Sequence, residues 1–311
     1  MWIGDSIHDL RDVPGPIHLA IGVFDGIHRG HQAVIDAAIQ SSQRQGGSPV
    51  VLTFDPHPLR VLRPERPPAL LTCTEHKILL LKRLGVHHLL LIPFTKDLAT
   101  TEAEDFILAM VGAAQPLKRI CVGHEWGFGQ GRRGNVELLT QLGRQHDFAV
   151  SGVAPVLHKN QVVSSTLIRA AVRSGDLQEA GELLGRPYTI LGRVVTGQGL
   201  GSKLGFPTAN LQVRAEQQPP PGVYVCKVCV NQTTYPAVAN LGFRPTINDG
   251  EPSPVLEVHL LDFQGDLYDQ SVELEFIFLL RPEQRFEQIA DLIEQIGRDV
   301  ETAREYFQSQ A

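Results

Sequence analysis

The chain has 311 residues, of which 42% are hydrophobic and 20% charged, the composition of a soluble globular protein long enough for two domains. Its net charge of -6 argues against a general nucleic-acid binder, which usually has a basic face, but still allows a local nucleotide site. No apolar run approaches the roughly 18 residues of a membrane span, and the N-terminus lacks a signal-peptide pattern. We therefore expect a cytoplasmic protein without a membrane or nucleic-acid partner.

The first half of the chain alternates short apolar runs with helical patterns. The expected strands are 17–23, 50–54, 88–93, 119–123 and 148–153. Helices are expected at 31–45 and 136–145, and two more are expected to open at caps in 72–75 and 101–104 and to end at Leu84 and near Val111. Thr72 and Thr101 each begin a Thr-x-x-Glu pattern that predicts a capped helix start. Alternation of strands and helices at this spacing predicts a Rossmann-like α/β domain, a parallel sheet with helices on both faces.

The pattern changes near Arg186-Pro187, after two predicted short helices at 165–173 and 176–184. The following expected strands are 188–196, 222–230, 234–240, 255–262 and 272–280. So many short strands separated by Gly- and Pro-rich turns predict an antiparallel β-barrel. An amphipathic pattern over 283–308 predicts a terminal helix packed on that barrel. We expect a domain boundary between residues 1–186 and 187–311.

Cys226 and Cys229 form a CxxC that lies within the expected strand 222–230. Residues three apart in a strand point to opposite faces, and no second cysteine pair completes a zinc site. We interpret both cysteines as structural.

A histidine-containing turn joins the first predicted strand to the first predicted helix. Its sequence is Gly22-Val23-Phe24-Asp25-Gly26-Ile27-His28-Arg29-Gly30-His31. A helix N-terminus offers unpaired N–H groups and partial positive charge, so it favours anions. His28 and His31 can face the same phosphates, and Gly30 allows close approach to the backbone. Two structural histidines on an ordinary turn are the alternative, but the preceding strand favours a nucleotide phosphate site.

A Ser/Thr-rich segment with an arginine, Ser164-Ser165-Thr166-Leu167-Ile168-Arg169, also precedes a helical pattern. Its hydroxyls and guanidinium could hold a leaving pyrophosphate and offset charge in the transition state. Such segments are also common as plain helix caps. Together with the histidine turn, the segment resembles the nucleotidyltransferase superfamily, which binds ATP with an HxGH motif and a later Ser/Thr-rich basic motif.

A second candidate phosphate site begins in the glycine-rich stretch 197–205 and continues through Phe206-Pro207-Thr208-Ala209-Asn210. A glycine loop can wrap phosphates, and the oxygens of Thr208 and Asn210 suit Mg²⁺. In the strand 255–262, Glu257 and His259 share one face and Leu256 and Val258 the other. If the polar face meets the ligand, Glu257 can act as a general base on a hydroxyl; otherwise it is a solvated carboxylate.

Over essentially its whole length, the chain resembles the bifunctional bacterial riboflavin kinase/FAD synthetases. The matching segments, in family order, are 22–32, 53–58, 122–129, 164–169, 204–211, 221–224, 239–242 with 244–246, and 256–263 with 267–268. The resemblance implies that the barrel transfers phosphate from Mg-ATP to riboflavin, giving FMN. It further implies that the N-terminal domain joins FMN to AMP from a second ATP, giving FAD and pyrophosphate.

The resemblance also implies residue roles. Catalytic roles fall to Glu257, His28 and His31, and metal binding to Thr208 and Asn210. ATP contacts are expected from Phe24, Gly26, His28, Gly30, His31, Ser164, Ser165, Thr166, Arg169, Gly205, Pro207, Thr208 and Asn210. Flavin contacts are expected from Phe54, Asp55, Pro56, His57, Pro58, Glu125 and Arg244. No oligomeric state follows.

The chain departs from the family pattern at a few positions. Many relatives have Asp or Asn at Glu125, a basic residue at Gly127 and Arg at Ser202. Lys203 can replace that arginine as a point charge but not as a bidentate fork. The departures at Glu125 and Ser202 motivate one alternative, a regulatory flavin- or nucleotide-binding protein without one or both activities. A separate alternative is a nucleotidyltransferase for another acceptor, with the barrel as a binding module.

Overall fold

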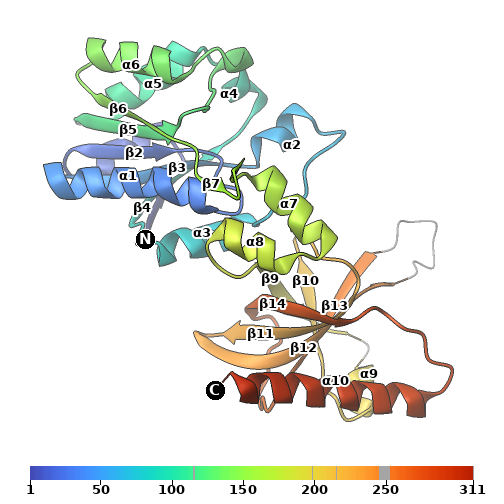
Figure 1. The fold of residues 1–311 in the computed structure, drawn as a ribbon. Coiled ribbons are helices and arrows are strands. Elements are labelled where there is room, and N and C mark those ends of the chain that lie inside the picture. The colour runs from blue at the N-terminus through green and yellow to red at the C-terminus, as the bar shows by residue number, and fades with distance from the viewer. Residues whose placement is uncertain (115, 198, 215, 245–252, 311) are drawn as a thin grey trace. The chain divides into compact units, whose positions relative to one another are not determined.

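The computed structural model describes residues 1–114, 116–197, 199–214, 216–244 and 253–310. The chain divides into two compact units, Met1–Ala69 with Thr74–Ser165 and Leu70–Cys73 with Thr166–Ala311 (Figure 1). The predicted functional boundary after residue 186 stays a prediction. None of the helices in the described ranges is long and apolar enough to cross a membrane.

In the described part of the first unit, six parallel strands form one sheet in the order β1-β4-β3-β2-β5-β6 (Figure 1). Their bounds are β1 Trp2–Gly4, β2 Ile17–Ile21, β3 Ser48–Asp55, β4 His88–Pro93, β5 Leu117–Gly123 and β6 Ala149–Val153. The predicted parallel sheet is confirmed, with β1 added at the edge. The chain passes from β2 to β3 on one side and later to β5 on the other, so a topological switch point lies at β2.

Helices cover both faces of this sheet, as predicted. Helices α1 (Arg29–Gln45) and α3 (Thr74–Arg83) bury apolar side chains against one face, and α5 (Ala103–Ala113) and α6 (Val136–Gln145) against the other. The shorter elements of this unit are η1 Ile7–Asp12, α2 Pro58–Leu62, α4 Lys96–Thr100, η2 Gln130–Arg132, β7 Leu157–His158 and β8 Gln161–Val162. The predicted cap at Thr101 is wrong: α5 starts after Glu102, and the Thr101 hydroxyl instead donates to the Asp97 carbonyl, 3.3 Å away.

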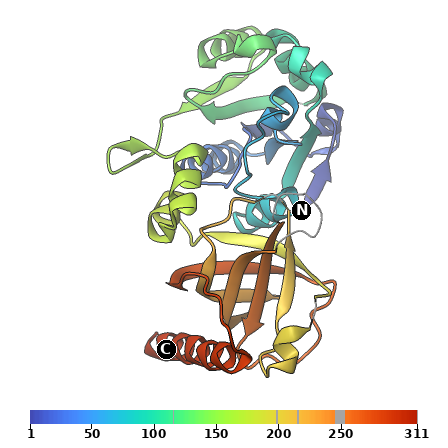
Figure 2. The same cartoon turned by 90° about the vertical axis from the view of Figure 1, so that its right-hand side faces the viewer.

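The described residues of the second unit form a closed barrel of six antiparallel strands, in the order β10-β13-β12-β11-β14-β9 (Figure 2). The strands are β9 Thr189–Val195, β10 Ala209–Val213, β11 Gly222–Val230, β12 Thr233–Arg244, β13 Ser253–Leu260 and β14 Ser271–Arg281. The helices of this unit are α7 Ser165–Ser174, α8 Leu177–Leu184, α9 Leu200–Lys203 and α10 Ile289–Ser309. The barrel is confirmed, and β10 is the strand that the sequence did not predict.

The terminal helix α10 begins at Ile289 rather than at residue 283. Its buried Ala303 packs with Val223, Val225 and Val238 from β11 and β12, so the predicted packing on the barrel is confirmed (Figure 2). Phe286 precedes the helix and instead lines a cavity, described below.

The segment Leu70–Cys73 belongs to the barrel unit because Glu216 holds it there. The Glu216 carboxylate, 5% exposed, accepts the backbone N–H of Cys73 at 2.8 Å and that of Leu191, in β9, at 2.9 Å. Leu70 also pairs with Glu216 in an isolated parallel bridge and accepts the N–H of Gln217. A residue distant in sequence thus satisfies backbone donors that would otherwise be buried without a partner.

Candidate active sites

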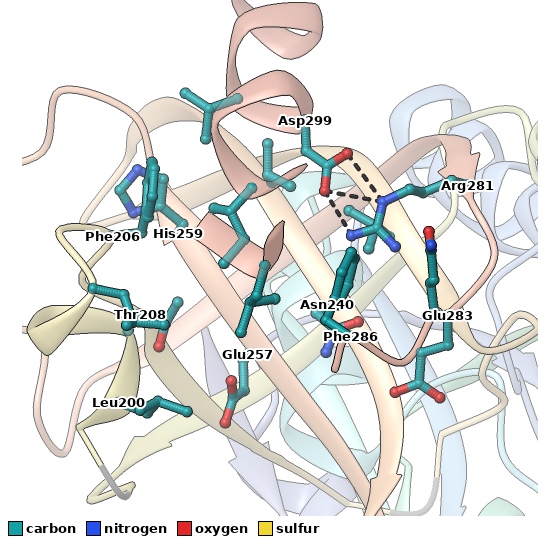
Figure 3. Close-up of a pocket in the computed structure, with 18 residues that line it drawn as sticks. Leu200, Phe206, Thr208, Asn240, Glu257, His259, Arg281, Glu283, Phe286 and Asp299 are labelled. Carbon is teal, nitrogen blue, oxygen red and sulfur yellow. Dashed lines mark hydrogen bonds and ion pairs between the residues drawn. The ribbon is translucent and has the colours of Figure 1, made fainter. Parts of the chain in front are cut away.

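A cavity of about 250 Å³ opens between the barrel wall, the segment after β14 and helix α10 (Figure 3). Thr208 and Glu257 lie toward one end of it, and Arg281, Phe286 and Asp299 toward the other. The predicted candidates Thr208 and Glu257 are therefore brought to the same cavity.

Glu257 stands on β13 between two asparagines on neighbouring strands. In the register of the barrel it lies opposite Asn210 of β10 and opposite Asn240 of β12. Leu256 and Val258 are buried, whereas Glu257 lines the cavity, so the predicted alternation of faces is confirmed. A carboxylate flanked by amides at a cavity can orient and deprotonate a substrate hydroxyl.

The segment before β10 is fixed by polar and aromatic contacts. The Pro207 carbonyl lies 2.8 Å from Nδ1 of His259, and the rings of Phe206 and His259 meet edge to face at 5.8 Å. A Cβ at Gly201 would lie 2.4 Å from the Phe206 carbonyl oxygen and 2.8 Å from Oγ1 of Thr208, so only glycine fits there. This packing sets the position of Thr208.

Thr208 also borders a second, smaller hollow of about 190 Å³. Pro207, Ser202 and Tyr268 line it as well. Thr208 therefore lies between the two hollows.

At the other end of the first cavity, a buried ion pair ties β14 to α10. Nε of Arg281 donates to the Asp299 carboxylate at 3.0 and 3.1 Å, and Nη2 donates at 2.8 Å (Figure 3). Asp299 is 2% exposed, and Gln295 donates a further hydrogen bond to it. The Arg281 guanidinium carbon also lies 5.8 Å from the centre of the Phe286 ring. This arrangement presents an aromatic ring and a fixed cation to a planar ligand.

Replacing Asp299 with asparagine is expected to leave the Arg281 charge without its partner and to lower the free energy of unfolding by about 3 kcal/mol. Thermal and denaturant unfolding measure this change. Asp262→Asn is the matched control, because Asp262 pairs with Arg304 at the surface and such pairs contribute little. Equal stability of Asp299→Asn and Asp262→Asn would contradict the importance of the buried pair.

In the first unit, the histidine turn lies at the carboxyl end of β2, the switch point of the sheet. His28 is the N-cap of α1, where its Nδ1 accepts the backbone N–H of His31 at 3.3 Å. Because Nδ1 of His28 accepts a hydrogen bond, the single proton of the neutral ring is on Nε2. Nε2 can therefore donate to a phosphate. A Cβ at Gly30 would lie 3.2 Å from the His28 ring, so a larger residue would crowd it.

The two predicted histidines stack on one another. The ring centres of His28 and His31 are 3.5 Å apart, and Phe24 meets the His31 ring edge to face at 5.3 Å. Nδ1 of His31 is buried and has no hydrogen-bond partner among the described residues. Burial lowers the pKa of His31 well below its usual value, and the nearby charges of His28 and Lys77 lower it further. The neutral ring therefore predominates at neutral pH, with a nitrogen left for a ligand.

A cavity of about 470 Å³ in the same unit is lined by apolar and aromatic side chains. Phe54, His57 and Pro58, three of the residues expected to contact flavin, line it. Trp126 and Phe128 also line it, with rings stacked at 4.4 Å. Stacked aromatics suit a flat aromatic ligand. The sequence pattern did not single out these two rings, because their stacking depends on the loop after β5.

The other predicted site residues lie as follows. The Ser165 hydroxyl donates to the Asp25 carbonyl at 2.9 Å, so this segment meets the histidine turn, whereas Thr166 and Arg169 belong to the second unit. Asp55, Pro56 and Glu125 are exposed and are absent from the lining of the large aromatic cavity. The side chain of Arg244 and the matching residues Pro245 and Thr246 lie outside what the structure describes.

Each half of the chain is similar to a different family of known proteins. Residues 11–167 match the family model for FAD synthetase, and residues 184–307 match that for riboflavin kinase. A bifunctional riboflavin kinase/FMN adenylyltransferase of Escherichia coli is 36% identical over 305 residues, covering 97% of this chain and 96% of the relative. The one from Pseudomonas fluorescens is 37% identical over 304 residues, covering 98% and 97%. A solved structure titled a macrolide-efflux protein from Streptococcus pneumoniae superposes with a TM-score of 0.82 at 30% identity, covering 98% and 99%.

The chain combines a parallel α/β unit that matches FAD synthetase with a β-barrel unit that matches riboflavin kinase. Together these two units define a transferase of flavin metabolism with two activities. The chain belongs to the bifunctional riboflavin kinase/FMN adenylyltransferase family. It is an enzyme that uses ATP to convert riboflavin to FMN and FMN to FAD.

Proposed function

We propose that riboflavin phosphorylation takes place where Thr208, Asn210 and Glu257 meet in the barrel. The observation that carries this proposal is the position of Glu257, which lines the cavity between two asparagines. Glu257 takes the proton of the riboflavin 5′-hydroxyl while the oxygen of that hydroxyl attacks the γ-phosphorus of ATP. ADP is the leaving group. The flavin ring lies toward Phe286 and Arg281, which places the sugar chain toward Glu257.

Thr208 and Asn210 fit a bound Mg²⁺. Two residues apart in an extended segment, their side chains point to the same side, and both offer the hard oxygen atoms that this ion prefers. When bound, Mg²⁺ supplies positive charge to the phosphates of ATP. The nucleotide approaches Thr208 from the hollow that Thr208 and Pro207 both line. Phe206, which follows Gly205, orders this segment through its contact with His259.

Adenylyl transfer takes place at the carboxyl end of β2. His28 and His31 donate to the phosphates of ATP, and FMN lies in the aromatic cavity with its ring against Trp126 and Phe128. A phosphate oxygen of FMN attacks the α-phosphorus, and pyrophosphate leaves. No protein nucleophile is required, because the residues position ATP and stabilise charge in the transition state.

Arg132 lies beside Gly127, the position at which many relatives have a basic residue. A Cβ at Gly127 would lie 2.9 Å from Nε of Arg132, so the Arg132 side chain occupies the space into which a side chain at 127 would extend. Both residues line the aromatic cavity, and Arg132 supplies a positive charge there. The charge of Arg132 at this cavity supports an enzyme with an active adenylyl-transfer site over a binding protein that has lost this activity. We place the enzyme in the cytoplasm, where riboflavin and ATP are available.

A time course with riboflavin, ATP and MgCl₂, followed by chromatography, tests the proposal. FMN is expected to appear first and then to convert to FAD, and removal of divalent metal by a chelator is expected to stop both steps. FMN without FAD would mean that the first unit has lost its activity. Flavin binding with no product would favour a regulatory binding protein.

A further inference from the structure

Helix α3 brings a buried lysine against the histidine turn. Lys77 is 5% exposed, and its Nζ donates to the Val23 carbonyl at 2.9 Å. The same carbonyl accepts a hydrogen bond from Oγ1 of Thr53, also at 2.9 Å. The Val23 carbonyl, just after β2, therefore accepts hydrogen bonds from the charged Lys77 on α3 and from the neutral Thr53 on β3. Burying an ammonium group is costly, so its presence here needs a reason beyond packing.

The turn that follows Val23 has an unusual backbone. Phe24, Gly26 and Ile27 have φ values of 51, 83 and 41°, in the left-handed region that residues other than glycine rarely adopt. Such a conformation of a non-glycine residue is strained and persists only where its surroundings hold it in place. The turn leads directly to His28, so an anchor at Val23 fixes the start of α1 and both histidine rings.

The charge of Lys77 also reaches the histidine pair. Burial is the main cause of the lowered pKa of His31, followed by the charge of His28, the N-cap of α1, and by that of Lys77 on α3. Asp25, which is buried in the same turn, is the acidic group nearest in the chain. Because Lys77 opposes a proton on His31, loss of its charge raises the pKa of that ring.

We propose that Lys77 is a positioning residue for adenylyl transfer, which acts through the Val23 carbonyl on the turn that presents His28 and His31. Its hydrogen bond holds the strained turn, and its charge adds to the burial that disfavours a proton on His31. This role rests on the proposed adenylyl-transfer site.

Three substitutions in the full-length enzyme separate the two effects. Lys77→Met removes both donor and charge, Lys77→Gln removes the charge but keeps an amide donor, and Thr53→Val removes the neutral donor but keeps the charge. FAD formation from supplied FMN is measured for each variant, with FMN formation from riboflavin as an internal control of folding. The titration of His31 is followed by NMR of protein labelled with ¹³C-histidine. The His31 signal is assigned as the one that is missing in His31→Gln.

We expect Lys77→Met to lower the rate of FAD formation about 10²-fold, as a misplaced catalytic group does, with FMN formation within twofold of the parent. The His31 titration midpoint is expected to rise in Lys77→Gln and Lys77→Met and to stay in place in Thr53→Val. Should Lys77→Met not fold, Lys77→Gln carries the test through the midpoint and through a smaller loss of FAD formation, because its shorter neutral amide is a weaker donor to the Val23 carbonyl. Normal FAD formation in the Lys77 variants, or an unmoved midpoint, would overturn the inference. Normal FAD formation in a variant without His28 and His31 would instead overturn the proposed site itself.

Discussion

Glu257→Ala is expected to abolish most FMN formation while FAD formation from supplied FMN continues. Loss of a general base typically costs about 10²–10⁴-fold in rate, and Glu257 lines the cavity at which the riboflavin hydroxyl is proposed to react. The adenylyl-transfer residues lie in the other compact unit, so this activity has no reason to change. Steady-state rates of the two reactions, each started with its own flavin, measure the effect.

Two further variants sharpen this experiment. Glu257→Gln keeps the size and polarity of the side chain but cannot accept the proton, so it is expected to be nearly as slow as Glu257→Ala. Glu301→Gln is the matched control, because Glu301 is an exposed carboxylate of α10 outside the cavity lining. Equal loss of both activities in Glu257→Ala would refute the model of two separate sites.

Simultaneous replacement of His28 and His31 with alanine is expected to give the reverse pattern. Removing one preorganised donor to a developing charge costs about 10²–10³-fold, so FAD formation should fall by at least that factor. FMN formation should stay close to that of the parent enzyme, because both histidines belong to the first unit. The measurement is again the pair of rates, each with its own flavin substrate.

His28 also caps α1, so part of the effect could come from the helix itself. His28→Asn keeps an acceptor for the cap, which is worth about 1 kcal/mol, and removes the imidazole. His146→Ala is the matched control for the loss of an exposed histidine in the same unit. FAD made at the normal rate by the double variant would rule out a phosphate role for the pair.

The candidate sites could be predicted only in part. Period-two alternation, which is local, placed Glu257 on a polar face, and the resemblance to a family gave it a catalytic role. The histidine turn was found because it lies between a strand and a helix. Asn240, Trp126 and Phe128 were not selected, because each becomes part of a site only through its neighbours: Asn240 through the register with Glu257, and the two rings through a loop. Lys77 is separated by 54 residues from the carbonyl that it holds.

Helical and strand periodicities are set within short windows of chain, so the amino-acid pattern predicted the type and order of most elements. It therefore predicted the parallel sheet and the barrel, and it placed the histidine turn between a strand and a helix. Features that depend on pairing between distant segments appear only in the folded chain: the edge strand β1, the barrel strand β10, the later start of α10 and the Arg281–Asp299 pair. Such contacts leave no local pattern, since their free energy arises only when the chain brings remote residues together.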